Sequence, residues 1–160
     1  MCSRGLLRER HDGGLGLPAP EQWHVEVLHS TDEIAPAVDR LVADLPGRGF
    51  SARDVFAVRL ALEEALVNAV KHGNQADPSR AVWLRSHRDN GCLCLQVEDE
   101  GPGFNPDDVP NPLDPENLER PTGRGLFLMR TYMDCVVYSE RGNRVTMCRQ
   151  RTAPVAALSV

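Results

Sequence analysis

The sequence predicts a two-layer α/β sandwich in which helices pack on one face of a largely antiparallel sheet. Its strand-like and helix-like segments follow one another in the order β-α-α-β-β-loop-α-β-β, which is typical of that architecture. Two turn sequences, Asp89-Asn90-Gly91 and Arg141-Gly142-Asn143, each join neighbouring strand-like segments into a hairpin. The 160 residues, of which 41% are hydrophobic, suffice for one domain with a sizeable core.

We expect this domain to occupy residues 21–150, between two tails. Residues 1–20 combine glycines and prolines with scattered charge and no periodicity, so they are expected to have little order, and residues 151–160 form a C-terminal tail. The chain has no apolar run long enough to cross a bilayer and no apolar segment of a secretory signal at its start, which favours the cytoplasm and no membrane partner. The net charge of −5, without an obvious basic patch, argues against direct nucleic-acid binding.

The five cysteines are expected to be reduced thiols. None of the pairs has the C-x-x-C spacing of a zinc or redox site. Cys92 and Cys94 are two apart in a predicted strand, which puts them on one face of the sheet. Free thiols are usual in cytoplasmic proteins.

The first two elements are a strand and a helix. Trp23, Val25 and Val27 alternate with polar residues, which indicates a half-buried strand. Ser30 and Glu33 have the spacing of a capping box at the start of a helix. The apolar stripe expected on this helix consists of Ile34, Val38, Leu41, Val42 and Leu45.

A second helix is the clearest element of the sequence. Ser51 and Asp54 have the spacing of another capping box, and Gly73 suits the left-handed position that follows a helix C-terminus. Between them, apolar residues recur at helical spacing, namely Val55, Val58, Leu62, Ala65, Leu66, Ala69 and Val70.

Beyond this helix come two hairpins, separated by a long irregular segment and a short helix. The strands are predicted over residues 81–88, 92–98, 135–140 and 144–149, and the helix over residues 125–133. The irregular stretch, residues 101–125, carries six prolines and only isolated apolar residues. A structureless segment of that length inside a compact domain is usually functional, so we expect a lid over about residues 104–122.

Three polar segments are candidates for chemistry, and the first lies on the second helix. Glu64 and Asn68 are four residues apart, so they share one helix face about one turn from each other. A carboxylate is a suitable general base, and an amide oxygen is a suitable hard ligand for Mg²⁺. The alternative is a solvated Glu64 and an Asn68 that bonds a neighbouring backbone group.

The second segment ends a strand. Asp99 follows the apolar positions of that strand, and Gly101 and Gly103 allow the backbone to turn sharply and approach a ligand closely. A carboxylate held there is able to accept a hydrogen bond from the amino group of a base. The alternative is an ordinary turn at the end of a strand.

The third segment leads into the short helix. Gly123, Arg124 and Gly125 place backbone N–H groups at a helix N-terminus, a ready site for phosphate to which the arginine adds charge. The alternative is a flexible hinge before an ordinary helix.

The order and spacing of these three segments resemble the GHKL ATPase superfamily. The E-x-x-x-N helix, the strand ending in D-x-G-x-G and the G-x-G that opens a helix are similar to the N box, G1 box and G2 box of its Bergerat fold. That fold is a two-layer α+β sandwich with helices on one face of a mostly antiparallel mixed sheet. The resemblance covers roughly residues 23–149. The stretches EEALVNAVKHGN, VEDEGPGF and GRGLFLMRTYMD most closely resemble the anti-sigma-factor serine/threonine kinases of bacterial partner switching.

The resemblance implies binding of ATP or ADP together with Mg²⁺. Glu64 would act as general base toward a serine hydroxyl on a protein substrate, Asn68 would coordinate Mg²⁺, and Asp99 would accept the adenine amino group. Glycines and an arginine complete the implied nucleotide site, with Gly101 and Gly103 beside the base and Gly123, Arg124 and Gly125 around the phosphates.

Three functions are compatible with this pattern. The first is an ATP-dependent protein serine/threonine kinase that phosphorylates an anti-sigma-factor antagonist and binds a sigma factor or another regulatory target, with a homodimer among the expected states. The second is a catalytically silent module whose bound nucleotide only sets the conformation that recognises a partner. The third, a plain α/β interaction domain without a ligand, requires all three motifs to be accidental. Loss of the Glu64 carboxylate separates the first from the second, because it removes transfer and leaves partner binding.

Overall fold

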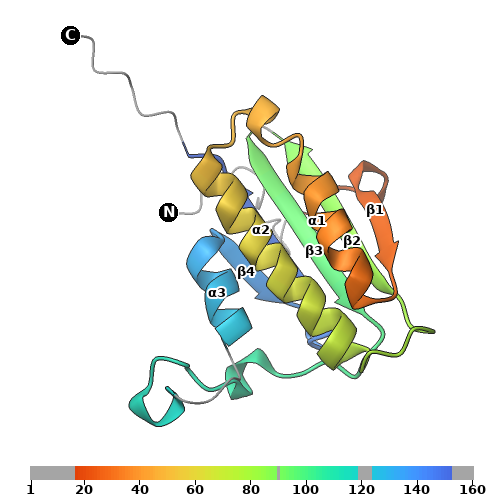
Figure 1. Ribbon diagram of the computed structural model, residues 1–160, viewed down its shortest axis with the longest axis vertical. Coiled ribbons are helices and arrows are strands. Elements are labelled where there is room, and N and C mark those ends of the chain that lie inside the picture. The colour runs from red at the N-terminus through yellow and green to blue at the C-terminus, as the bar shows by residue number, and fades with distance from the viewer. Residues whose placement is uncertain (1–16, 90, 119–123, 153–160) are drawn as a thin grey trace, which may run out of the picture.

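The computed structural model describes residues 17–89, 91–118 and 124–152. One sheet has the strand order β1-β2-β3-β5-β4, formed by β1 (His24–Leu28), β2 (Val82–Asp89), β3 (Cys92–Asp99), β5 (Arg144–Gln150) and β4 (Cys135–Tyr138). Three helices, α1 (Ile34–Val42), α2 (Ala52–Val67) and α3 (Arg124–Tyr132), lie together on one face of this sheet (Figure 1). The predicted two-layer sandwich is therefore confirmed.

The sheet is antiparallel at every pairing of the described strands, so the mixed sheet implied by the resemblance is not found. Hairpins account for the β2–β3 and β4–β5 pairs. Two helices separate β1 from β2, and they run in opposite directions (Figure 1). The chain therefore re-enters the sheet from the end at which β1 finished, and β2 pairs with β1 in the antiparallel sense.

The core lies between the two layers, with α2 at its centre. Leu62 and Leu66 of α2 are fully buried, as are Leu93 and Leu95 of β3 and Met129 of α3. Because side chains alternate along a strand, the odd-numbered residues of β3 face the helices. This packing fixes α2 against β3, the two elements that carry the first two motifs.

The strand β1 forms as expected, but a different residue is buried. Val25 and Val27 are 48% and 47% exposed, whereas Leu28 is buried. The register pairs Val25 with Arg85 and Val27 with Trp83. Alternation thus predicted the strand correctly but not which of its side chains reach the core.

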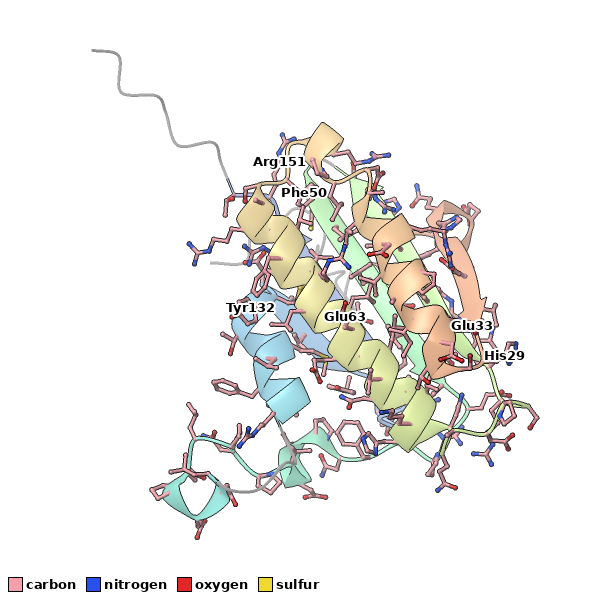
Figure 2. The ribbon with its side chains drawn as sticks, viewed as in Figure 1. His29, Glu33, Phe50, Glu63, Tyr132 and Arg151 are labelled. Atoms are coloured by element: carbon pink, nitrogen blue, oxygen red, sulfur yellow. The ribbon has the colours of Figure 1, made fainter. Side chains whose placement is uncertain are left out.

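The helix α1 follows the predicted pattern. All five members of its expected apolar stripe are buried. Before the helix, the Glu33 carboxylate accepts hydrogen bonds from the backbone N–H groups of His29 and Ser30. Figure 2 shows His29 and Glu33 side by side at this end of α1. The acidic residue therefore fixes the chain where it enters the helix.

The start of α2 is tied to the sheet through Asp54. The capping box is confirmed, because Asp54 N–H donates to the Ser51 hydroxyl and Ser51 N–H donates to the Asp54 carboxylate. The same fully buried carboxylate accepts from Arg149 at 2.8 Å and from both the backbone and the hydroxyl of Thr152 at 3.0 Å. Thr152, which the sequence places in a tail, is thus bonded to the domain.

Residues near the start of the described chain are also bonded to their neighbours. The indole N–H of Trp23 donates to the carbonyl of Pro18, and Pro20–Gln22 forms a 3₁₀ turn, so residues before 21 contact the domain. Residues 1–16 and 153–160 lie outside the described residues. The division into one domain and two tails stays a prediction.

Within the described residues, Cys92, Cys94 and Cys148 are free thiols. Cys94 and Cys148 are buried on neighbouring strands, with their sulfur atoms 3.5 Å apart. A hydrogen bond to Cys148 and burial raise the pKa of the Cys92 thiol, which keeps it protonated.

Within the described residues, no helix is both long and apolar enough to cross a membrane.

Protonation of Asp54 is expected to destabilise the fold. Burial alone would raise the pKa of Asp54, but hydrogen bonds from Ser51, Thr152 and Arg149 outweigh it and lower the pKa to about 2, from an ordinary 3.8. A lowered pKa contributes stability that is present above 3.8 and is lost as the pH falls toward 2, here about 2 kcal/mol. Urea unfolding across this pH range should show that loss. In Asp54→Asn the free energy of unfolding should be lower at neutral pH and should vary less with acid, whereas Asp108→Asn, at an exposed position, serves as the matched control. Identical pH profiles for Asp54→Asn and the parent chain would contradict this account.

Candidate functional site

The site begins where α2 ends. The sequence predicts one helix up to Gly73, but the α-helix stops at Val67 and Asn68–Gly73 forms a π-helical turn. Its wider winding appears in the hydrogen bond from the Asn74 N–H to the carbonyl of Ala69, five residues earlier. Such π turns occur frequently at functional sites. Here the turn carries Asn68 at its start and Gly73 at its end.

Gly73 is required for a close approach and not for a left-handed backbone. It is absent from the glycines with positive φ, which corrects the expected capping role. A Cβ at Gly73 would lie within 3.0 Å of the Asp99 carboxylate, and one at Gly101 would lie within 3.0 Å of the Gly73 carbonyl. Real Cβ atoms essentially never come that close. The π turn and the end of β3 therefore meet at a point where only glycine fits.

Burial and local hydrogen bonding act in opposite directions on Asp99. Burial raises the pKa of this carboxyl, while the hydrogen bond from the Gly101 N–H, 2.8 Å from Oδ1, lowers it, and the net shift is upward. The carboxylate is half-buried at the end of β3. It is therefore held in a fixed orientation, with its desolvation partly offset by a single backbone donor.

Two asparagines that the sequence analysis did not single out hold the backbone around Asp99. The Asn143 amide donates to the Asp99 carbonyl at 2.9 Å, and the Asp99 N–H donates to the Asn143 carbonyl at 3.0 Å. The buried Asn74 side chain accepts from the Glu100 N–H at 2.8 Å and donates to the Ala81 carbonyl at 2.9 Å. An asparagine just after a helix and another in a hairpin turn are common, so no local signal marks either residue.

The second glycine of the D-x-G-x-G segment contacts another turn. Gly103 has φ +76°, and a Cβ there would collide with the carbonyl of Arg141 in the β4–β5 turn. Gly142, with φ +78°, is equally close to the carbonyl of Phe104. The Phe104 ring also packs edge-on against Tyr138, with centroids 5.0 Å apart. The loop after β3 thus packs closely against the β4–β5 turn.

The first and third motifs meet at the start of α3. A Cβ on Gly125 would lie 2.8 Å from the Glu64 carboxylate and 3.2 Å from the Asn68 amide. The neighbouring Glu63 instead lies on the outer side of α2 and forms an ion pair with Arg59 at 3.9 Å (Figure 2). Of two consecutive glutamates, only Glu64 is aimed at α3. A hard carboxylate and an amide are therefore placed together beside a helix N-terminus.

The remaining predicted residues are placed less completely. Gly123 lies outside the described residues. The Arg124 guanidinium donates to the carbonyl of Leu118 at 3.0 Å, so it contacts the C-terminal part of the expected lid. Lys71 and His72 are exposed. Arg124 therefore lies at the start of α3, as expected, and its guanidinium is hydrogen-bonded to the Leu118 carbonyl.

The expected lid is described only as far as residue 118. In this part it contains two 3₁₀ turns, Pro106–Asp108 and Pro115–Asn117. The buried Asn117 side chain donates to the carbonyl of Asn111, and Val109 packs against the core. The segment is thus held by short-range turns, by the apolar contacts of Phe104 and Val109 and by the hydrogen bond from Arg124.

Neither of two surface hollows, of about 390 and 450 Å³, is lined by a residue that the sequence assigned to the site. The smaller one is lined in part by Glu98, Asn143 and Arg144, beside the backbone that carries Asp99. Among the described residues, the candidate site is therefore defined by the contacts between segments given above. Among the described residues, no group of three or more His, Cys, Asp or Glu side chains is placed to hold a metal ion.

Known proteins share sequence similarity with this chain. The family described as histidine kinase-like ATPase domain matches residues 28–149. The chain is similar to the anti-sigma F factor of Geobacillus thermodenitrificans, with 37% identity over 93 residues, and to that of Clostridium perfringens, with 36% identity over 97 residues. It is also similar to the serine-protein kinase RsbW of Bacillus licheniformis, with 33% identity over 108 residues.

These alignments are partial on both sides. They cover 56%, 56% and 63% of this chain, and 62%, 68% and 68% of the three relatives in the same order. The chain thus spans less than two thirds of the length of the Geobacillus relative that it matches.

A methyl group at Gly101 is expected to destabilise the protein. In Gly101→Ala the added carbon meets the Gly73 backbone, which cannot rotate away, so the free energy of unfolding should fall by about 1–3 kcal/mol. Gly47→Ala is the matched control, because nothing lies within 4 Å of its added carbon, and its effect should be below about 1 kcal/mol and stabilising. Urea midpoints followed by circular dichroism compare the two variants. Equal midpoints would show that the close approach is not required.

Proposed function

Because the chain belongs to the family of histidine kinase-like ATPase domains, we propose that it is an ATP-dependent protein serine/threonine kinase and anti-sigma regulatory factor. It would phosphorylate an anti-sigma-factor antagonist and bind a sigma factor or another regulatory target. The names of the relatives, anti-sigma F factor and serine-protein kinase RsbW, support both halves of the proposal.

The observation that carries the proposal is the convergence of Glu64, Asn68 and Gly125. At the start of α3, the Glu64 carboxylate and the Asn68 amide both come within 3.2 Å of the point that a Cβ on Gly125 would occupy. A helix N-terminus is a ready site for phosphate, and a carboxylate placed beside it is a candidate general base. Kinase chemistry needs little covalent work from the protein and depends mainly on positioning and electrostatic stabilisation. Under the proposal, this convergence would contribute to the positioning.

The residues present fit an adenine nucleotide and Mg²⁺. The absence of side chains at Gly73 and Gly101 leaves the Asp99 carboxylate bordered by backbone, which suits a flat base beside it. The Asn68 amide oxygen would be a hard ligand for Mg²⁺, with phosphate oxygens and water completing the shell. When bound, Mg²⁺ would neutralise charge on the phosphates.

Each residue would then have one role. Asp99 would accept a hydrogen bond from the adenine amino group, with Gly101 and Gly103 shaping the loop beside it. Gly123, Arg124 and Gly125 would hold the phosphates. Glu64 would take the proton of the acceptor serine as its oxygen bonds to the γ-phosphoryl and ADP departs.

The proposal includes a cytoplasmic location and allows a homodimer. The free thiols of Cys92, Cys94 and Cys148 fit a reducing compartment. If transfer is absent while nucleotide and partner still bind, the catalytically silent module described above becomes the function. The following two experiments separate these outcomes.

Nucleotide binding should depend on Asp99. Calorimetric titration with ATP and ADP, with and without Mg²⁺, should show magnesium-dependent binding by the parent chain. Asp99→Asn should weaken ADP binding about 10- to 100-fold, because a hydrogen bond to a charged acceptor is lost. Asp89→Asn, exposed at the end of β2 that lies away from Asp99, is the control and should bind as the parent does. If the folded parent chain bound neither nucleotide, both the kinase and the silent nucleotide-dependent module would be excluded.

Transfer should depend on Glu64 and not on Glu63. With radiolabelled ATP and the anti-sigma-factor antagonist encoded in the same genome, Glu64→Gln should lower the rate of phosphorylation about 10²- to 10⁴-fold, the usual contribution of a general base. The affinity for ADP should change little. Glu63→Gln removes the adjacent carboxylate, which pairs with Arg59 on the outer surface, and should transfer normally. Equal rates in the two variants would exclude Glu64 as the base.

A further inference from the structure

The end of β3 is tied down at three successive residues. Both backbone polar groups of Asp99 bond to Asn143, at 3.0 and 2.9 Å. The N–H of Glu100 bonds to Asn74, and the carbonyl of Gly101 accepts weakly from the Arg141 guanidinium at 3.4 Å. The donors and acceptors come from two sides, the π turn after α2 and the β4–β5 turn.

The carboxylate itself is bonded differently from the backbone that carries it. Among the described residues, it accepts from the Gly101 N–H through Oδ1, and no side chain donates to it. The backbone is therefore fixed while the other carboxylate oxygen retains acceptor capacity. Because this backbone is fixed before the ligand binds, the entropic cost of ordering the acceptor is not paid on binding.

From this geometry we infer that Asn143 is a positioning residue, which fixes the Asp99 backbone so that the carboxylate selects the 6-amino group of an adenine nucleotide. The inference rests on the proposed function, since it deepens the role proposed for Asp99. Asn143 does not touch the base in this account. It acts through the strand end, with Asn74 holding the next residue from the other side.

A hydrogen bond to the amino group predicts a specific form of selectivity. Inosine diphosphate carries a carbonyl where ADP carries the amino group, so it presents an acceptor to the acceptor oxygen of Asp99. A site built to hydrogen-bond a ligand group discriminates strongly against the analogue that lacks it. Asn143 should therefore affect the ratio of the affinity for ADP to the affinity for inosine diphosphate.

The test measures this ratio calorimetrically in the full chain with Mg²⁺, for the parent, Asn143→Ala and Asn143→Asp. Asn143→Ala removes the donor to the Asp99 carbonyl, and Asn143→Asp replaces it with an acceptor of the same size. Both should bind ADP about three- to tenfold more weakly, while the affinity for inosine diphosphate stays the same or rises. The ratio of the two affinities should fall accordingly.

The matched control is Ser139→Ala. Ser139 lies in the same turn and its hydroxyl is 3.5 Å from the Asn143 side-chain oxygen, so this variant perturbs the turn and leaves the donor to Asp99 in place. It should keep the parent ratio. An unchanged ratio in both Asn143 variants, or equal weakening toward both nucleotides, would overturn the inference and leave Asn143 as a structural turn residue.

A measurement on the parent chain covers the case in which both variants unfold. The Asp99 amide should be protected from hydrogen exchange before ADP is added, and ADP should increase that protection little. Protection that develops only with ADP would overturn the inference. Failure of the parent to bind ADP would be seen before any variant is made, and it would overturn the proposed function together with this inference.

Discussion

One close approach, between the end of β3 and the π turn after α2, constrains the rest of the structure. The carboxylate of Asp99 fills the space that a side chain at Gly73 would need, and the carbonyl of Gly73 fills the space above Gly101. The helix layer and the sheet therefore meet here at close range, with only the Asp99 carboxylate packed against the Gly73 backbone. Any shift of one layer along the other would move Asp99 directly. The packing of the two layers therefore determines where the Asp99 carboxylate lies.

The opposite end of α2 is fixed by other means. The buried Asp54 carboxylate joins the start of the helix to Arg149 on β5 and to Thr152 beyond it. A helix held at both ends cannot slide or rotate without breaking one of these contacts. Glu64 and Asn68 lie between the two anchors, so their distance from the start of α3 is set by the packing of the whole layer and not by their own bonds.

Features set by neighbouring residues are predictable from the sequence, and features set by distant ones are not. The capping box of Ser51 and Asp54 and the hairpin turns depend on residues a few positions apart, and they form as expected. The requirement for glycine at position 73 comes from Asp99 on another element, which no local pattern encodes. Asn143 likewise lies 44 residues from the backbone it holds. The exposed faces of Val25 and Val27 escape prediction for the same reason, because alternation identifies a strand but not the layer that covers it.

The two ends of the candidate site depend on different kinds of contact. Around Asp99 the site depends on glycine contacts between backbones and on hydrogen bonds that hold the strand end, whereas around Gly125 it consists of the side chains of Glu64 and Asn68. A side chain can be replaced without rebuilding the fold, but a backbone contact between two layers cannot. Under the proposed function, nucleotide recognition is therefore bound to the stability of the domain, while phosphoryl transfer is separable from it. Under that proposal the same scaffold would be able to support a kinase or a silent nucleotide-dependent binder, according to whether residue 64 acts as the base.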